Sequence, residues 1–329
     1  MLVTEERRGV DLIGDVHGCA ISLCLLLDRM GYRRINGVYR HPHRRVVFIG
    51  DIVDRGPHIR EALHIVRAMV DAGEADIIMG NHEYNLLCYL TPKADGEGYL
   101  RAHTARHQRI LQQTLDQFHG HEYELQEYME WFLQLPLFIE TDRFRAVHAC
   151  WHQTLIDQFV EQRGGNRIDK AFLLRSAEEG SFEWEVMDRL LRGTHLRLPN
   201  DEVIVSKDGF KRHFFRTKFW SDNPQRMGDV VFQPDPLPEH IARRELTDSQ
   251  RADLLHYGPD EKLLFMGHYW CEGTPAPIRD NIACLDFSAV KYGKLVAYRL
   301  DDETALRADK FVWVDVAREV GRMDVEMGG

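Results

Sequence analysis

Several short apolar segments of the sequence end in a polar cluster that could perform chemistry. Five segments share this pattern: residues 10–13, 46–49, 77–79, 144–147 and 263–266. Each is followed by metal-capable side chains, which are Asp15 and His17, Asp51 and Asp54, Asn81 and His82, His148, and His268. Carboxylate oxygen, amide oxygen and neutral imidazole suit borderline divalent metals such as Mn, Fe, Zn or Ni. The recurring pattern therefore indicates a metal site with mixed nitrogen and oxygen ligands.

The elements that must position these side chains are predicted to be buried strands and intervening helices. Apolar runs of four to six residues bounded by glycine are typical of buried strands. Helical spacing of apolar residues at 19–30 and 59–70 separates the first three runs, which is the signature of strand–helix–strand units in a layered α/β fold. In such folds the ligand site lies outside the carboxyl ends of the strands. Residues far apart in the sequence are therefore expected to meet.

No single motif carries this prediction. An aspartate after Gly14 is by itself as well explained by a turn or a helix cap. Most of the 17 histidines are expected to be surface or satisfied residues. Because five predicted strand ends all carry metal-capable side chains, a shared metal site becomes the better interpretation. Burying Asp15 and Asp51 together without counter-charge would be very costly, and bound cations offset such repulsion.

Composition limits the class of protein. The chain has 329 residues, a formal charge of −10 and 29% charged residues, which is ordinary for a globular protein. The acidic balance disfavours a nucleic-acid partner, although it allows a phosphate substrate at a metal site. We expect no membrane span and no signal peptide, and hence a cytoplasmic location. Six scattered cysteines without a CxxC pair predict reduced thiols.

The length is compatible with a single domain over 1–329, with a cap or insertion within 151–260. One or two amphipathic helices are predicted over 102–135, and a strand-like run over 211–220. The segments 282–287 and 294–300 are predicted to form a hairpin around 291–293. Neither 91–143 nor 151–260 carries a motif that names a substrate.

The sequence resembles the calcineurin-like metallophosphoesterases, and most closely a bacterial relative of their phosphoprotein (Ser/Thr) phosphatase branch. The resemblance rests on GDVHG at 14–18, GDIVDRG at 50–56 and GNHE at 80–83, followed by the histidine motifs at 147–148 and 267–268. A second histidine often follows the last one by two positions in the wider family. Trp270 stands there in this sequence, as expected for the phosphatase branch.

The resemblance implies a layered α-β-β-α sandwich with a dinuclear metal site at the carboxyl ends of the strands. Asp15 and His17 would hold the first metal, Asp51 would bridge both, and Asn81, His148 and His268 would complete the second. The two divalent ions would be manganese foremost, with Fe, Zn, Ni or Mg as alternatives. A hydroxide held between the metals would attack phosphorus in line with the leaving group.

The same resemblance implies roles for the remaining motif residues. Arg55 and Asn81 would bind the substrate phosphate, His82 would protonate the departing oxygen, and Asp54 would orient that imidazole. Glu83 is expected to be structural. A further phosphate-binding arginine is expected from the segment between the last two histidines, where Arg216 and Arg226 are the candidates. A solvated basic face is an equally good interpretation of both arginines.

Three functions are the main alternatives, and a basic strip at 211–213 with Arg216 also keeps open a role in processing nucleic-acid ends, which the acidic balance disfavours. The leading one is a two-metal phosphoesterase that hydrolyses a small phosphomonoester or a phosphoprotein. The second is a hydrolase of dinucleoside polyphosphates of the diadenosine tetraphosphate type. Many symmetrically cleaving enzymes of that type lack an aspartate at the Asp54 position and have one at the Glu83 position, which disfavours that version. The third, from another class, is a catalytically silent metal- or nucleotide-binding interaction module, which the complete set of motif residues disfavours.

Overall fold

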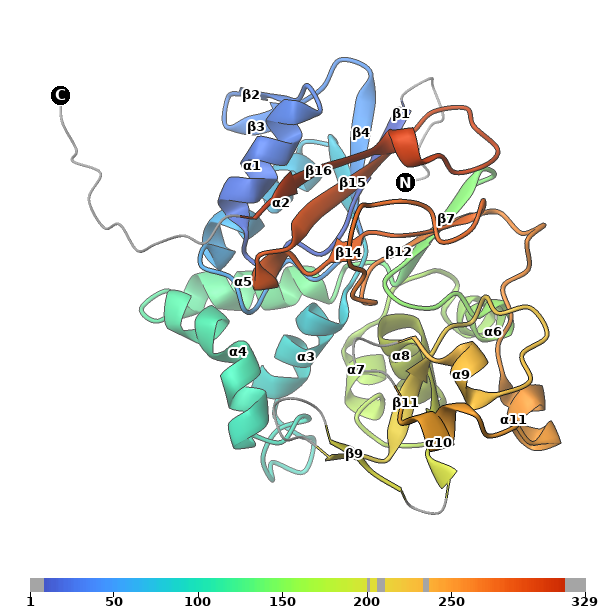
Figure 1. Cartoon of the computed structure of the whole chain (residues 1–329). Coiled ribbons are helices and arrows are strands. Elements are labelled where there is room, and N and C mark those ends of the chain that lie inside the picture. The colour runs from blue at the N-terminus through green and yellow to red at the C-terminus, as the bar shows by residue number, and fades with distance from the viewer. Residues whose placement is uncertain (1–8, 200–201, 206–210, 233–236, 317–329) are drawn as a thin grey trace.

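The computed structural model describes residues 9–199, 202–205, 211–232 and 237–316. Two sheets form its centre (Figure 1). The first sheet has the order β14-β15-β1-β4-β5, with β16 also paired to β15, and the second has the order β13-β12-β7-β6. The first comprises β1 (Gly9–Ile13), β4 (Arg44–Phe48), β5 (Ala75–Ile77), β14 (Asp286–Phe287), β15 (Lys294–Leu300) and β16 (Phe311–Asp315). The second comprises β6 (Phe138–Glu140), β7 (Phe144–Val147), β12 (Leu263–Met266) and β13 (Ile282–Cys284).

The five strands expected from the sequence are divided between these two sheets. Strands β1, β4 and β5 are parallel to one another, as are β7, β12 and β13. Their side chains alternate between two apolar layers. Leu12, Val47 and Phe265 lie in the layer shared by the two sheets, whereas Ile13 and Met266 pack with the helices. This alternation follows from the two-residue period of a strand, and it confirms the α-β-β-α sandwich.

Helices cover the outer faces of the sandwich. On the first sheet lie α1 (Ala20–Arg29) and α2 (Ile59–Asp71), with the small β2 (Arg33–Ile35) and β3 (Val38–Arg40) hairpin between them in sequence. The chain then forms α3 (Asn81–Leu90), α4 (Ala105–Gln117) and α5 (Glu122–Phe132), so the predicted helical region at 102–135 contains two helices. The helices that follow β7 are α6 (Gln153–Arg163), α7 (Lys170–Arg175) and α8 (Phe182–Arg192).

The segment after α8 has its own small apolar cluster. It contains β8 (Thr194–Arg197), β9 (Ile204–Val205), β10 (Lys211–Arg212), β11 (Phe214–Thr217), α9 (Met227–Val230), α10 (Glu239–Ala242) and α11 (Asp248–Asp253). Phe215, Met227 and Ile241 are among the residues of the cluster. These elements gather at one end of the molecule (Figure 1). The separate cluster supports the proposal that part of 151–260 is a cap on a single-domain fold.

Two sequence-based element assignments need correction. The run predicted as one strand at 211–220 consists of β10 and β11, and it ends at Thr217. The hairpin predicted from 282–287 and 294–300 is also wrong in its first half. Strand β13 pairs with β12 of the second sheet, the Leu285 amide donates to Met266 O, and only β14 then joins β15. The chain therefore passes from one sheet to the other at Leu285, a crossing that hydrophobicity alone does not indicate.

Candidate metal centre

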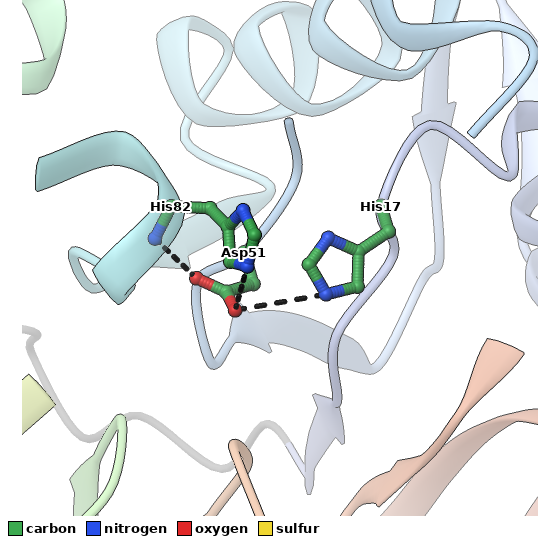
Figure 2. A group of neighbouring side chains, drawn as sticks. All are labelled: His17, Asp51 and His82. Carbon is green, nitrogen blue, oxygen red and sulfur yellow. Dashed lines mark hydrogen bonds and ion pairs between the residues drawn. The ribbon is translucent and has the colours of Figure 1, made fainter. Parts of the chain in front are cut away.

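The polar side chains that follow five strands converge on the Asp51 carboxylate. Asp51 Oδ2 lies 3.4 Å from His148 Nε2, 3.7 Å from His17 Nε2 and 3.9 Å from His82 Nε2. Figure 2 shows the His17 and His82 rings approaching this carboxylate from different elements, the loop after β1 and the start of α3. The His82 amide donates to Asp51 Oδ1 at 2.8 Å. The carboxylate thus accepts from the N-terminus of α3, where the helix dipole favours negative charge.

A second group of donors surrounds the side-chain oxygen of Asn81. Asn81 Oδ1 lies 3.0 Å from His148 Nε2 and 2.6 Å from His268 Nδ1. Two sets of potential ligand atoms each fit within 4.8 Å, namely His17, Asp51 and His82, and Asp15, Asp51 and His148. Asp51 belongs to both sets. All six residues that the sequence named as metal ligands lie in this cluster, but the two sets divide them differently from the prediction. His17 is grouped with His82, which was expected to be a proton donor, and Asp15 is grouped with His148.

Unpaired buried atoms show that this cluster fits a cation. In the described part of the chain, Asp15 Oδ1 and His268 Nε2 are buried without a hydrogen-bond partner. Burial, together with the charges of Asp286 and Asp51, raises the pKa of Asp15 well above its ordinary value. Burial lowers the pKa of His17 to about 3, so this ring is neutral and available as a ligand. Neutral imidazoles beside crowded carboxylates are the donor set of a divalent metal.

His148 is the exception among these rings. Burial lowers its pKa, but the adjacent Asp51 carboxylate outweighs burial, and the pKa of His148 rises to about 10. Burial raises the pKa of Asp51, but the neighbouring histidines, His148 foremost, outweigh burial and hold this pKa well below its usual range. In the absence of a metal, Asp51 and His148 therefore behave as an ion pair. A cation that binds here must displace the His148 proton, so metal binding is coupled to proton release.

Backbone strain is concentrated at the same place. Nine non-glycine residues of the described chain have positive φ, and five of them belong to the predicted site: His17, Asp51, Asp54, Arg55 and His268. Their φ values lie between 44° and 71°. Such conformations cost about 1–3 kcal/mol each and persist where the surroundings fix them, which is common at functional sites.

Glu83 and Gly80 hold the loop that presents Asp51. The Glu83 carboxylate accepts from the amides of Asp51 and Gly80 through Oε2, and from Ile52 and Val53 through Oε1, at 2.8–3.2 Å. A Cβ on Gly80 would come 2.3 Å from the Asp51 amide nitrogen, so no other residue fits without displacement. The structural role expected for Glu83 is therefore visible as four backbone contacts.

Asp54 and His82 form a buried hydrogen-bonded pair beside Asp51. His82 Nδ1 lies 2.6 Å from Asp54 Oδ2, and the Thr114 hydroxyl donates to Asp54 Oδ1 at 2.5 Å. Burial raises the pKa of Asp54 to about 7 and lowers the pKa of His82 to about 3. Because the two groups share a hydrogen bond, the proton bound near neutral pH belongs to the pair. The bond at Nδ1 leaves Nε2 of His82 directed toward Asp51.

The three predicted phosphate-binding arginines occupy different positions. Arg55 is half-buried in the strained loop, and its guanidinium carbon lies 5.6 Å from the Trp270 ring centroid. Arg216 on β11 donates to the His268 carbonyl at 3.2 Å, which brings the cap to the cluster. Arg226 is exposed at the start of α9, where its backbone contacts Asp229 and Glu245. Within the described residues, the contacts of Arg226 lie in the cap and not at the cluster.

Sequence reasoning missed three residues beside the site. Thr114 on α4 gave no signal, because a threonine in a polar helix is ordinary. Asp286 on β14 is buried near Asp15, and its signal was a charged residue within an otherwise apolar strand pattern. Lys291 lies with its ammonium 3.4 Å from the Trp270 ring centroid, which only the folded chain reveals.

Comparison with known proteins agrees with this geometry. A family model described as calcineurin-like phosphoesterase matches residues 10–269. Over 81 residues the chain is 44% identical to bis(5'-nucleosyl)-tetraphosphatase PrpE [asymmetrical] of Halalkalibacterium halodurans, covering 24% of this chain and 33% of that protein. The protein of the same name from Oceanobacillus iheyensis is 29% identical over 175 residues, covering 53% and 66%. The chain thus spans less than two thirds of the length of either relative.

Among solved structures, a protein serine/threonine phosphatase from Saccharomyces cerevisiae matches with a TM-score of 0.50 and 12% identity, over 96% of this chain and 82% of that one. This likeness shows a shared fold. The chain belongs to the calcineurin-like phosphoesterases, a family that depends on dinuclear metal centres. In the part of the chain that the structure describes, no helix is long and apolar enough to cross a membrane.

Proposed function

We propose that this protein is a two-metal phosphoesterase whose substrate is a nucleoside polyphosphate, cleaved with Asp51 at the centre of the site. The observation that carries the reaction class is the convergence of two ligand sets on one buried carboxylate. Asp15, His17 and Asp51 would hold one cation, and Asp51, Asn81, His148 and His268 the other. When bound, two divalent cations stabilise charge on the phosphoryl oxygens and supply a nucleophile at neutral pH.

The remaining residues bind the substrate and move a proton. Arg55, with Asn81 beside it, would contact phosphate oxygens, a task for which a planar guanidinium is suited. His82 would deliver a proton from Nε2 to the departing oxygen, and Asp54 would fix the ring through Nδ1. The raised pKa of Asp54 supports this role, since the pair retains a proton until about pH 7. Arg216, through its contact with His268, is a candidate for a further phosphate contact.

Two observations favour a nucleoside polyphosphate over the simple phosphomonoester or phosphoprotein that sequence reasoning placed first. The relatives found are named as asymmetrical bis(5'-nucleosyl)-tetraphosphatases, whereas the sequence-based objection concerned symmetrical enzymes. In addition, the Trp270 ring lies close to two cations, Arg55 and the exposed Lys291. Two cations at one aromatic ring suit a chain of several phosphates better than a single phosphate.

A substrate panel with added Mn²⁺ tests this proposal. The panel consists of diadenosine tetraphosphate, p-nitrophenyl phosphate, its bis ester and a phosphopeptide. We expect the dinucleotide to be turned over with the highest kcat/KM and to yield AMP and ATP. Preference for the monoester or the phosphopeptide would overturn the substrate assignment. Preserved metal binding with no turnover of any ester would overturn the enzymatic proposal and favour an interaction module.

A further inference from the structure

Asp286 is a buried carboxylate that is not among the six proposed metal ligands. It is 2% exposed, at the start of β14, where the chain has just crossed between the sheets. Its Oδ1 accepts from the Ser288 amide at 2.9 Å. Its Oδ2 is buried, and among the described residues it has no hydrogen-bond partner. An unpaired carboxylate oxygen in such a place is costly unless a cation or an ordered water meets it.

The backbone places Asp286 beside Asp15. Gly14 and Leu285 are packed so closely that a Cβ on Gly14 would come 2.1 Å from Leu285 O. The residues that follow each of them, Asp15 and Asp286, are therefore neighbours at the ends of β1 and β14. Electrostatics agrees, because after burial Asp286 is the largest influence that raises the pKa of Asp15. Asp15 Oδ1 is also without a partner in the described structure.

Two neighbouring carboxylates with one unpaired oxygen each form half of a cation site. Burying two like charges without compensation is strongly unfavourable, and a divalent ion between them removes the repulsion. An alternative explanation is that Arg216 compensates the buried charge of Asp286, because the two charges influence each other. The guanidinium, however, donates to the His268 carbonyl, and Oδ2 of Asp286 stays unpaired.

The geometry points to Asp286 as a further carboxylate for the cation on the Asp15 side of the centre, held directly or through one water. That cation would then have one anionic partner more than the six motif residues provide. The inference rests on the proposed two-metal function, and it adds a residue on which affinity for that ion depends. Partners of this kind typically contribute 10–100-fold in metal affinity.

The test compares Mn²⁺ binding by the full-length wild type, Asp286→Asn and Glu183→Gln, using calorimetry and metal analysis. Glu183 is a matched control, because its Oε2 is also buried and unpaired but its other oxygen is ion-paired with Arg175. We expect Asp286→Asn to bind one of two Mn²⁺ equivalents at least tenfold more weakly, and Glu183→Gln to bind both as the wild type does. Two equivalents of unchanged affinity in Asp286→Asn would overturn the inference.

Thermal unfolding distinguishes two roles for Asp286, as a ligand of the cation or as a structural counter-ion of Arg216. For a ligand, Asp286→Asn leaves the chelator-treated protein as stable as the wild type or more so, and reduces the rise in Tm produced by Mn²⁺. A lower Tm without metal and an unchanged rise with Mn²⁺ would assign Asp286 to Arg216 and overturn the proposal. Wild-type protein that binds no Mn²⁺ would refute the two-metal function itself, a result distinct from equal binding by wild type and variant.

Discussion

His82 Nδ1 and Asp54 Oδ2 lie 2.6 Å apart, and both side chains are almost completely buried. The contact fixes the imidazole so that its other nitrogen faces the Asp51 carboxylate. Thr114, from a helix that the motifs do not include, completes the arrangement by donating to the second Asp54 oxygen. The proposed proton donor, His82, is thereby held beside the predicted metal ligands by the buried side chains of Asp54 and Thr114.

Removing the His82 ring should slow the hydrolysis of phosphate esters to an extent that depends on the leaving group. In His82→Ala we expect both metals to remain, and turnover of esters with poor leaving groups to fall by roughly 10²–10⁴-fold. Esters of acidic phenols need little protonation and should be affected least. Rates measured across a series of leaving-group pKa values provide the check. An equal loss across the series would remove the general-acid role.

Thr114→Val tests whether the orientation of Asp54 matters. The substitution keeps the shape of the side chain and removes the hydroxyl that bonds Asp54 Oδ1. A buried hydrogen bond to a charged group is worth about 1.5–3 kcal/mol, so we expect kcat to fall by at least tenfold with little change in metal content. Thr114→Ser is the matched control and should restore kcat. Equal activity of the valine and serine variants would contradict the positioning role.

Asp51→Asn should disrupt the metal centre. Asp51 belongs to both ligand sets, so its replacement should remove at least one metal and nearly all activity. Metal analysis of the purified variant alongside kcat is the relevant measurement. Retention of both metals together with activity would refute a bridging role for this carboxylate.

Asp54 should make folding depend on pH in the metal-free protein. Burial raises its pKa from an ordinary 3.8 to about 7, so the folded state holds a proton that the unfolded state releases. This contribution favours the folded state at low pH and is lost as pH rises from about 4 to 7. The free energy of unfolding of Asp54→Asn, measured in urea relative to wild type, should therefore rise by up to about 1.4 kcal/mol per pH unit across that window. A difference independent of pH would contradict the shift.

Lys291→Gln should distinguish long phosphate chains from single phosphates. The ammonium lies beside Trp270 and is exposed, so we expect a KM increase of about two- to fivefold for diadenosine tetraphosphate. The KM for p-nitrophenyl phosphate should not change, since one phosphate is already met at Arg55. Parallel changes for the two substrates would show that Lys291 does not contact the outer phosphates.

The sequence was sufficient for the parts of the structure that local chemistry determines. Glycine after an apolar run predicted the ends of β1 and β4 to within one residue, whereas β5 ends at Ile77, two residues before the predicted end. Residues that follow these strands are among those that meet at Asp51. Glu83 was expected to be structural, and its four backbone contacts agree with that expectation.

Other parts of the site depend on contacts between distant segments, which a single sequence does not encode visibly. Thr114 reaches Asp54 across 60 positions, and Arg216 reaches His268 across 52. Asp286 was hidden in a run assigned to one strand, because apolar patterning does not reveal that the chain changes sheets at Leu285. The sequence favoured Arg216 and Arg226 equally as phosphate-binding residues. Only the fold shows that Arg216 contacts His268 and that the contacts of Arg226 lie in the cap.

The most direct test is the anomalous scattering of crystals grown with Mn²⁺, measured at the manganese edge. The account predicts two peaks about 3.5–4 Å apart, one on each side of the Asp51 carboxylate. The first should be bordered by Asp15 and His17, and the second by Asn81, His148 and His268. A single peak away from Asp51, or no peak within this cluster, would contradict it.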